Sequence, residues 1–288
     1  MKQLNNGVIK VIKYFSFFEY NPTGKEIYTF LQAKIDKNSL NIKLDNMVKQ
    51  KKISASKDTP PQYSIGRKIS NIKYQISKRK LNNWRYKAYI QLLSLFPQIK
   101  LAGLSGSISM MNAEENDDVD LFIITAKNRL FTGRLITLVI AQLFGLRRSR
   151  KTQSSNNKIC LNLFFDESNL KVPKFKQTEF VGHEVLQMKP IIIKGDIYKR
   201  FLEANEWVFR LFPNAKLVFS MKYKVSRIKK ILNTKYSILN TFFNIIESIF
   251  KRIQLDSINK HRTTEIITST QLWFHPDDFE KRLTELDK

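Results

Sequence analysis

The sequence predicts an α+β fold, with a small sheet between a helical N-terminal module and a helical C-terminal region. Three short segments, residues 99–104, 121–125 and 158–165, have the length and the apolar content of buried strands. Most of the remaining chain carries apolar residues at the three- and four-residue spacing of amphipathic helices. A length of 288 residues is enough for two modest domains.

Residues 1–66 predict a winged-helix-like module, because three helical segments precede a hairpin. The second helix is indicated by the capping-box pair Thr23 and Glu26, and the third follows Ser39. A turn at residues 58–61 separates the two short strands of the hairpin. In a winged helix, the Asn, Gln and Lys side chains of the third helix suit contacts in a DNA major groove. The alternative is a module that binds protein or another domain.

The rest of the chain divides into three further segments. Residues 67–96 predict one basic linker helix that ends at a proline. Residues 97–190 predict the core, which contains the three strands and a basic loop at residues 147–155. Residues 191–288 predict a mainly helical C-terminal region.

The charge of the chain favours an anionic partner. The net charge is +25, from 50 Lys and Arg against 25 Asp and Glu. Neutralisation of phosphates by Lys and Arg dominates nucleic-acid affinity, so a phosphate-bearing ligand is expected, with nucleic acid as one candidate. The alternative is a composition set by an AT-rich genome, because Lys, Asn and Ile are all abundant.

Cysteine usage and hydropathy predict a cytoplasmic protein. Cys160 is the single cysteine, which excludes a disulfide within the chain, and the N-terminus does not have the pattern of a signal peptide. Both features favour a reducing compartment. Residues 130–146 and 236–250 are apolar but carry polar or charged residues, so packed helices and no stable membrane insertion are expected.

The residues that carry chemistry lie in GLSGSISMMNAEENDDVDLFIIT, residues 103–125. Asp118 and Asp120 are two residues apart on a strand, so both carboxylates leave the same face. They repel each other unless a cation lies between them, and such pairs suit Mg²⁺ or Mn²⁺. Gly106 and Ser107 open a short helix, where free amides favour an anion and glycine lets a phosphate approach the backbone. A solvated acidic turn is the alternative, but it does not explain Asp120 within an apolar strand.

This stretch resembles the signature of the DNA polymerase beta-like nucleotidyltransferase superfamily: a Gly-Ser pair, ten intervening residues, and then Asp-hydrophobic-Asp-hydrophobic. Over most of residues 100–280 the chain is also similar to a group of prokaryotic nucleotidyltransferase-domain proteins, on the segments KICLNLFF, HEVLQMKPI, FLEANEWV and QLWFHPDD. The resemblance implies a small mixed-sheet nucleotidyltransferase core flanked by helices. It also implies transfer of a nucleoside monophosphate from an NTP, such as ATP, to a hydroxyl group.

The same resemblance implies roles for individual residues. Gly106 and Ser107 would hold the triphosphate, while Asp118 and Asp120 would bind the Mg²⁺ or Mn²⁺ that bridges it. The superfamily places a third carboxylate on a later strand.

Two side chains are candidates for that third position. Asp166, at the end of the third strand, is the candidate carboxylate, and Asn162, at the centre of that strand, is the alternative occupant. Arg134, on the helix after the acidic strand, is a candidate for phosphate contact or, alternatively, an arginine of a packed helix. His183 has no second His four residues away, so we expect it at a helix surface or cap rather than in a zinc site.

Two main functions therefore remain open, and a membrane-surface protein that uses its basic amphipathic helices is a third possibility. The first is a metal-dependent nucleotidyltransferase with Asp118, Asp120 and Asp166 as catalytic residues, an NTP as donor, and a nucleic acid or other anionic molecule as acceptor. The second is a nucleic-acid-binding regulator whose transferase domain binds nucleotide but is degenerate. Asn162 at the third position would favour the second function.

Overall fold

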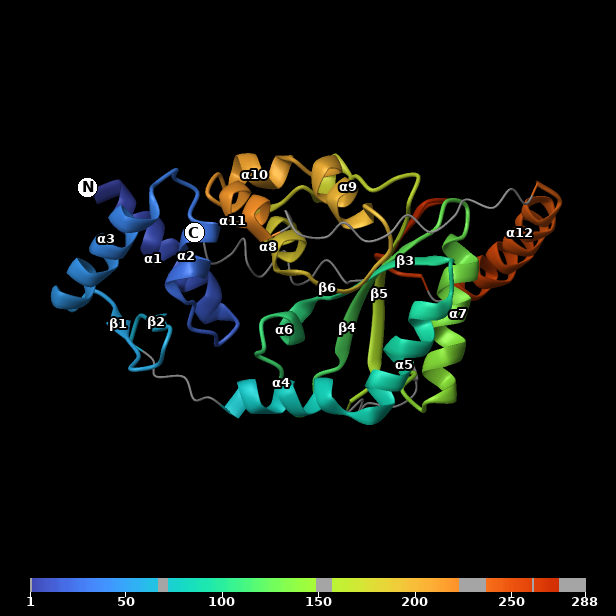
Figure 1. The fold of residues 1–288 in the computed structure, drawn as a ribbon, viewed down its shortest axis with the longest axis horizontal. Helices are drawn as coiled ribbons and strands as arrows, with labels where there is room; N and C mark the ends of the chain where they lie inside the picture. Colours follow the sequence, from blue (N-terminus) through green and yellow to red (C-terminus); the bar gives the residue numbers. More distant parts are fainter. Residues whose placement is uncertain (1, 67–71, 149–156, 223–236, 261, 275–288) are drawn as a thin grey trace. The chain divides into compact units, whose positions relative to one another are not determined.

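The computed structural model describes residues 2–66, 72–148, 157–222, 237–260 and 262–274. Within these residues it is a mixed α+β structure with twelve α-helices, a two-stranded hairpin and a six-stranded mixed sheet (Figure 1). The chain falls into two compact units: unit 1 holds residues 1–72, 177–186 and 206–226, and unit 2 holds residues 73–176, 187–205 and 227–288. Across the described ranges, none of the helices is long and apolar enough to cross a bilayer.

The six-stranded sheet is the centre of unit 2 and has the order β6-β3-β4-β5-β8-β7. Its strands are β3 (Ile99–Leu104), β4 (Val119–Thr125), β5 (Ile159–Asp166), β6 (Lys189–Ile193), β7 (Ile266–Ile267) and β8 (Gln271–Trp273). β4 and β5 are parallel, and the other neighbouring pairs are antiparallel. A parallel pair needs a crossover connection, which α7 (Leu130–Leu143) supplies between β4 and β5.

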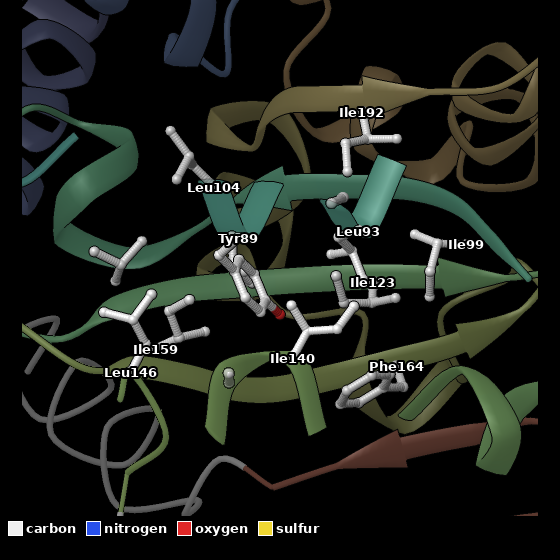
Figure 2. Packing of buried hydrophobic residues seen from close by; sticks show 14 of the residues in the cluster. Tyr89, Leu93, Ile99, Leu104, Ile123, Ile140, Leu146, Ile159, Phe164 and Ile192 are labelled. Carbon is white, nitrogen blue, oxygen red and sulfur yellow. The ribbon is translucent and has the colours of Figure 1, made fainter. Parts of the chain in front are cut away.

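One face of this sheet is covered by α5 (Trp84–Leu95) and α7 (Figure 2). Tyr89 of α5 and Ile140 of α7 lie against Ile123 of β4 and Phe164 of β5, and the exposed fractions of these four side chains are 3 % or less. Burial of such side chains contributes roughly 1.5–3 kcal/mol each. The helices are therefore held to the sheet by apolar contact.

The opposite face is covered by α9 (Ile197–Ala204). The ring of Phe201 lies 5.1 Å from that of Phe122 on β4 and 6.2 Å from that of Phe165 on β5, centroid to centroid. Because neighbouring residues of a strand point to opposite faces, these two strands are apolar on both sides. The predicted double burial of the third strand is confirmed over its C-terminal half.

Three strands of the sheet, β6, β7 and β8, were not expected from the sequence. A proline is expected to stop a helix, but Pro190 lies in β6 as the partner of Gly103, next to a register shift in β3. β6 is an edge strand, where a missing backbone N–H is tolerated. β8 has three residues, too few for a periodic pattern.

The predicted linker helix of residues 67–96 is two helices in the described part, α4 (Ile72–Asn82) and α5. The break occurs at Asn83, whose side chain accepts a hydrogen bond of 2.9 Å from the backbone N–H of Arg85. Asn83 is thus the N-cap of α5. α9 likewise ends next to a side chain that binds backbone groups: the buried Asn205 amide is hydrogen-bonded to Leu170, Val172 and Phe201.

Unit 1 begins with three helices and a hairpin in the predicted order: α1 (Lys2–Phe17), α2 (Gly24–Phe30), α3 (Lys37–Lys49), β1 (Ser54–Ala55) and β2 (Tyr63–Ser64). The capping box at the start of α2 is confirmed: the Thr23 side chain accepts from the Glu26 backbone, and the Glu26 carboxylate accepts from the Thr23 N–H. The unit also contains α8 (Glu179–Gln187), α10 (Trp207–Leu211) and α11 (Ala215–Lys222).

His183 of α8 lies in the core of unit 1, not at the helix surface or cap that we expected. Its ring is stacked between Tyr14, at a centroid distance of 3.7 Å, and Phe30, at 4.2 Å. It is 1 % exposed. Burial, followed by the charge of Lys10, lowers the pKa of His183 well below its usual value.

We therefore expect unit 1 to lose stability at acid pH through His183. The folded chain keeps a neutral imidazole, whereas the unfolded chain takes up a proton below about pH 6.5. The stabilising contribution is complete above about pH 6.5 and is lost as the pH falls through the lowered pKa. Thermal unfolding midpoints of the wild type should thus fall with acidification more steeply than those of His183→Phe, which keeps an aromatic ring in the stack.

Tyr14→Phe is the control for this experiment, because it changes the stack but keeps His183. Its midpoint should follow the wild-type pH dependence. If His183→Phe has the same pH dependence as the wild type, His183 is not the titrating group.

Candidate functional site

Asp118 and Asp120 lie at the start of β4. Asp118 directly precedes the strand and is 9 % exposed, and Asp120 is its second residue. The neighbouring side chains Val119 and Leu121 are buried in the apolar core, so the strand fixes which face each residue takes. The backbone therefore carries two acids into a partly buried position, where their charge must be compensated.

Gly106 lies directly against the carboxylate of Asp120. Its φ is +59°, a region that favours glycine, and a Cβ added to it would lie 2.6 Å from Oδ2 of Asp120. It opens α6 (Gly106–Ser109), a single helical turn whose N-cap residue, Ser105, makes no side-chain capping bond. Leading amides that are not capped in this way require another acceptor. The turn thus places backbone amides and a carboxylate side by side.

Ser107 is tied to the loop between the first two core strands. Its hydroxyl donates a 2.7 Å hydrogen bond to Oδ2 of Asp117, which also accepts from the backbone N–H of Glu114 at 3.0 Å. Asp117 is therefore a structural acid of the loop, which distinguishes it from its neighbour Asp118.

The other acids of the loop are bound by α4. The buried ammonium of Lys80 donates to the backbone oxygens of Glu115 and Asp117, at 2.8 and 2.7 Å. Lys73 pairs with Glu114 at 2.7 Å, and Arg79 pairs with Glu115. Burial lowers the pKa of Lys80, and Asp117, Glu115 and Asp118 oppose this shift. α4 thereby compensates the loop acids and fixes the chain that leads into Asp118.

On the β5 side, Asn162 lies next to Asp120. Its Nδ2 donates a 2.9 Å hydrogen bond to Oδ1 of Asp120, and its Oδ1 accepts from the thiol of Cys160 at 2.8 Å. Burial and the negative charge of Asp120 raise the pKa of the Cys160 thiol to about 12, so the thiol is protonated at neutral pH. Of the two candidates for the third position, the structure therefore brings Asn162 to the acidic pair.

Asp166 lies at the other end of β5. It is the register partner of Thr125, five residues along β4 from Asp120, which corresponds to roughly 16 Å at the rise of a strand. Its carboxylate accepts from the backbone N–H groups of Ser168 and Arg129, at 2.9 and 3.3 Å. The expectation that Asp166 joins Asp118 and Asp120 is corrected: it stabilises the turn after β5.

Arg134 is also placed away from the pair. It lies on α7, which follows the opposite end of β4, and its Nη1 donates to Gln254 Oε1 of α12 (Ser237–Asn259) at 2.7 Å. Its Cζ is 5.0 Å from the centroid of the Phe274 ring. This position agrees with the alternative interpretation, in which Arg134 is an arginine of a packed helix. It does not agree with the expected contact of Arg134 with a phosphate.

Arg148 is the residue of the site that sequence reasoning missed. Its Nη1 lies 3.4 Å from Oδ2 of Asp118 and donates to Sγ of Cys160 at 3.6 Å. The backbone N–H of Lys158 donates to Oδ1 of Asp118 at 3.3 Å. Arg148 belongs to a segment interpreted only as a basic loop, and the rest of that loop, residues 149–156, lies outside the described residues. No periodic pattern marks such a residue.

The donor set fits one hard cation but not two. In the described part of the chain, no group of three or more His, Cys, Asp and Glu side chains is arranged to hold a metal ion. The pair Asp118 and Asp120 supplies two carboxylates, which is what Mg²⁺ takes from a protein when substrate phosphates and water complete its shell. Asn162 adds a neutral carboxamide where a second cation would need a further negative charge.

Comparison of the chain with protein-family models, with curated proteins and with solved structures found no match. The interpretation of the site therefore depends on its own geometry.

The contact between Gly106 and Asp120 can be tested by substitution, with Gly195 as the control position. Gly195 has a similar φ of +65°, but nothing lies within 4 Å of a Cβ added there. Gly195→Ala should cost only the backbone strain, about 1–2 kcal/mol. Gly106→Ala should cost more, because the new methyl group also displaces the Asp120 carboxylate. Urea unfolding of the two variants measures the difference, and equal losses would show that the contact is unimportant.

Proposed function

We propose that the chain is a metal-dependent nucleotidyltransferase that moves a nucleoside monophosphate from an NTP to a hydroxyl group. The observation that carries the proposal is the contact between Gly106 and Asp120. A glycine turn without a side-chain cap lies beside the carboxylate of Asp120, two residues from Asp118 at the start of the same strand. A triphosphate with its cation is the ligand that needs both features at once. The Gly-Ser and Asp-x-Asp pattern of the resembled superfamily supports the same assignment.

In this proposal each residue has a defined task. Asp118 and Asp120 hold one Mg²⁺ or Mn²⁺, which neutralises charge on the phosphates. Gly106 and the amides of its turn bind triphosphate oxygens. A cation held by Asp118 would replace the ion pair of Asp118 with Arg148 and leave the guanidinium of Arg148 available to an anion outside the pair.

The transfer itself balances as a displacement at phosphorus. The acceptor oxygen forms a bond to the α-phosphorus while the bond from the α-phosphorus to the pyrophosphate oxygen breaks, and pyrophosphate leaves with that electron pair. The hydroxyl proton passes to water, because the carboxamide of Asn162 is not a base.

Loss of one carboxylate tests the proposal. Asp120→Asn should weaken Mg²⁺-dependent NTP binding by at least about tenfold, the effect of removing one close charge worth about 1.4 kcal/mol. The measurement is calorimetric titration of ATP and the other NTPs with and without Mg²⁺. Label transfer from each NTP to RNA, protein and small-molecule acceptors is followed in parallel.

Asp196→Asn is the matched control, because this carboxylate is 71 % exposed and lies outside the site. It should bind NTP as the wild type does. Binding that is independent of Mg²⁺, or equal in Asp120→Asn and the wild type, would contradict the proposal.

A second function, nucleotide binding without transfer in a nucleic-acid-binding regulator, is favoured by one observation: Asn162 is the side chain next to Asp120. Under that function the wild type binds NTP with Mg²⁺ but transfers no label to any acceptor. Under the first function the wild type transfers label and Asp118→Ala does not. The same two assays therefore separate the two functions.

The variant Asn162→Asp tests the role of the carboxamide. A third carboxylate beside Asp120 removes a hydrogen-bond donor and adds like-charge repulsion, so the variant should unfold at a lower temperature than the wild type without divalent cations. Mg²⁺ or Mn²⁺ should raise its midpoint by more than that of the wild type. Asn259→Asp adds the same charge at the exposed C-terminal residue of α12, and divalent cations should not raise its midpoint more than that of the wild type. An equal response of both variants to cations would contradict the placement of Asn162 at the metal site.

A further inference from the structure

Trp84 is an exposed tryptophan at the beginning of α5. Its exposed fraction is 68 %, whereas the other two tryptophans of the chain, Trp207 and Trp273, are 8 % and 6 % exposed. The guanidinium carbon of Arg85 lies 5.7 Å from its ring centroid. A large aromatic ring in water next to a cation is typical of a surface that receives a partner.

A series of contacts connects this ring to the acidic pair. A Cβ placed on Gly145 would lie 4.0 Å from Nη1 of Arg85, and the carbonyl oxygen of Gly145 accepts a 2.7 Å hydrogen bond from the ammonium of Lys158. The backbone N–H of Lys158 in turn bonds Asp118. A series of contacts thus runs from Trp84 to Asp118.

We call this surface the basic strip and define it as Trp84, Arg85, Arg147, Arg148 and Lys158. Among the described residues, its one acidic contact is the ion pair of Arg148 with Asp118. The helices beside it contain no Asp or Glu in residues 72–95, and their exposed Lys78 and Lys87 add positive charge. The nearest acids along the loop are already paired with α4. The strip therefore has a surplus of positive charge.

We propose that the basic strip binds a single strand of nucleic acid, whose terminal hydroxyl is the acceptor of the transfer; this second part rests on the proposed function. A base stacks on Trp84, and phosphates of the strand bind Arg85, Arg147 and Lys158. The strip ends at Asp118, so the strand is led to the site where the nucleotide is held. Donor and acceptor thereby meet at the end of β4.

The composition of the strip favours a single strand over other polyanions. A duplex hides the faces of its bases, so Trp84 would have no ring to stack on. Binding to an anionic membrane is strengthened by several large apolar side chains beside the cations. The strip contains a single large apolar side chain, Trp84. A protein partner usually fills several such positions in the core of its interface. Cations in a row that ends at one exposed ring match a phosphate backbone with accessible bases.

Binding of a fluorescein-labelled single-stranded RNA or DNA oligonucleotide tests the proposal. Fluorescence anisotropy is recorded without NTP and without divalent cations. Trp84→Ala should weaken binding about tenfold, the effect of losing one stacked base, whereas Trp84→Phe should keep most of the affinity. Arg85→Ala should reduce the slope of log K against log salt by about one.

Two variants in unit 2 serve as controls. Phe175→Ala removes another exposed ring, 69 % exposed, and Lys199→Ala removes another exposed cation, with a side chain 74 % exposed. Both should bind the oligonucleotide as the wild type does. Trp84 also reports directly: the oligonucleotide should quench the fluorescence of wild type but not that of Trp84→Phe.

Three results would overturn the inference. They are equal binding by wild type and Trp84→Ala, tighter binding of a duplex than of the single strand, and quenching of Trp84 by phosphatidylglycerol vesicles but not by the oligonucleotide. Oligonucleotide binding by Asp120→Asn tests the strip separately from the proposed function. A strip that binds the strand in a chain that does not bind NTP supports the surface and contradicts the transferase. NTP binding without strand binding supports the transferase and contradicts the surface.

Discussion

The charge of two acids at the start of one buried strand is the constraint on which the site depends. β4 cannot place Asp118 and Asp120 at the edge of an apolar core unless other groups compensate them. Arg148 and the Lys158 amide compensate Asp118, and Asn162 donates to Asp120. The close backbone of Gly106 completes the surroundings of the second carboxylate. These partners come from three segments, so the acidic pair brings together the loop after α7, the turn after β3 and the start of β5.

The acids of this region have two different roles, which follow from their partners. Glu114, Glu115 and Asp117 are contiguous with Asp118 apart from Asn116, yet they are bound by Lys73, Arg79, Lys80 and Ser107. These contacts hold the loop to α4. The sequence alone shows one acidic cluster, and the structure separates it into acids that fold the loop and acids that face the site. Basic residues of α4 are thus part of the support of the site, not only of the net charge.

The sequence predicted the fold where patterns are local and failed where they are not. The capping box of Thr23 and Glu26 and the apolar β5 strand depend on neighbouring residues, and both are present. Pro190 in β6 was missed, because an edge strand accepts a proline that local rules assign to a helix stop. The site divides in the same way: the alternation of Asp118 and Asp120 follows from the period of a strand, but the choice between Asn162 and Asp166 depends on the register of β4 with β5. Arg148 follows from no local rule.

Arg148 links the two binding events that we propose, because it belongs both to the surroundings of Asp118 and to the basic strip. While Arg148 pairs with Asp118, part of its positive charge is neutralised within the site. A cation at Asp118 replaces this pairing and returns a positive charge to the strip, so cation and nucleotide binding should strengthen binding of the strand. Linkage is reciprocal: the strand must then strengthen binding of nucleotide and cation by the same factor. Under the proposed function, the chain would therefore bind its acceptor strand most tightly when nucleotide and cation are bound.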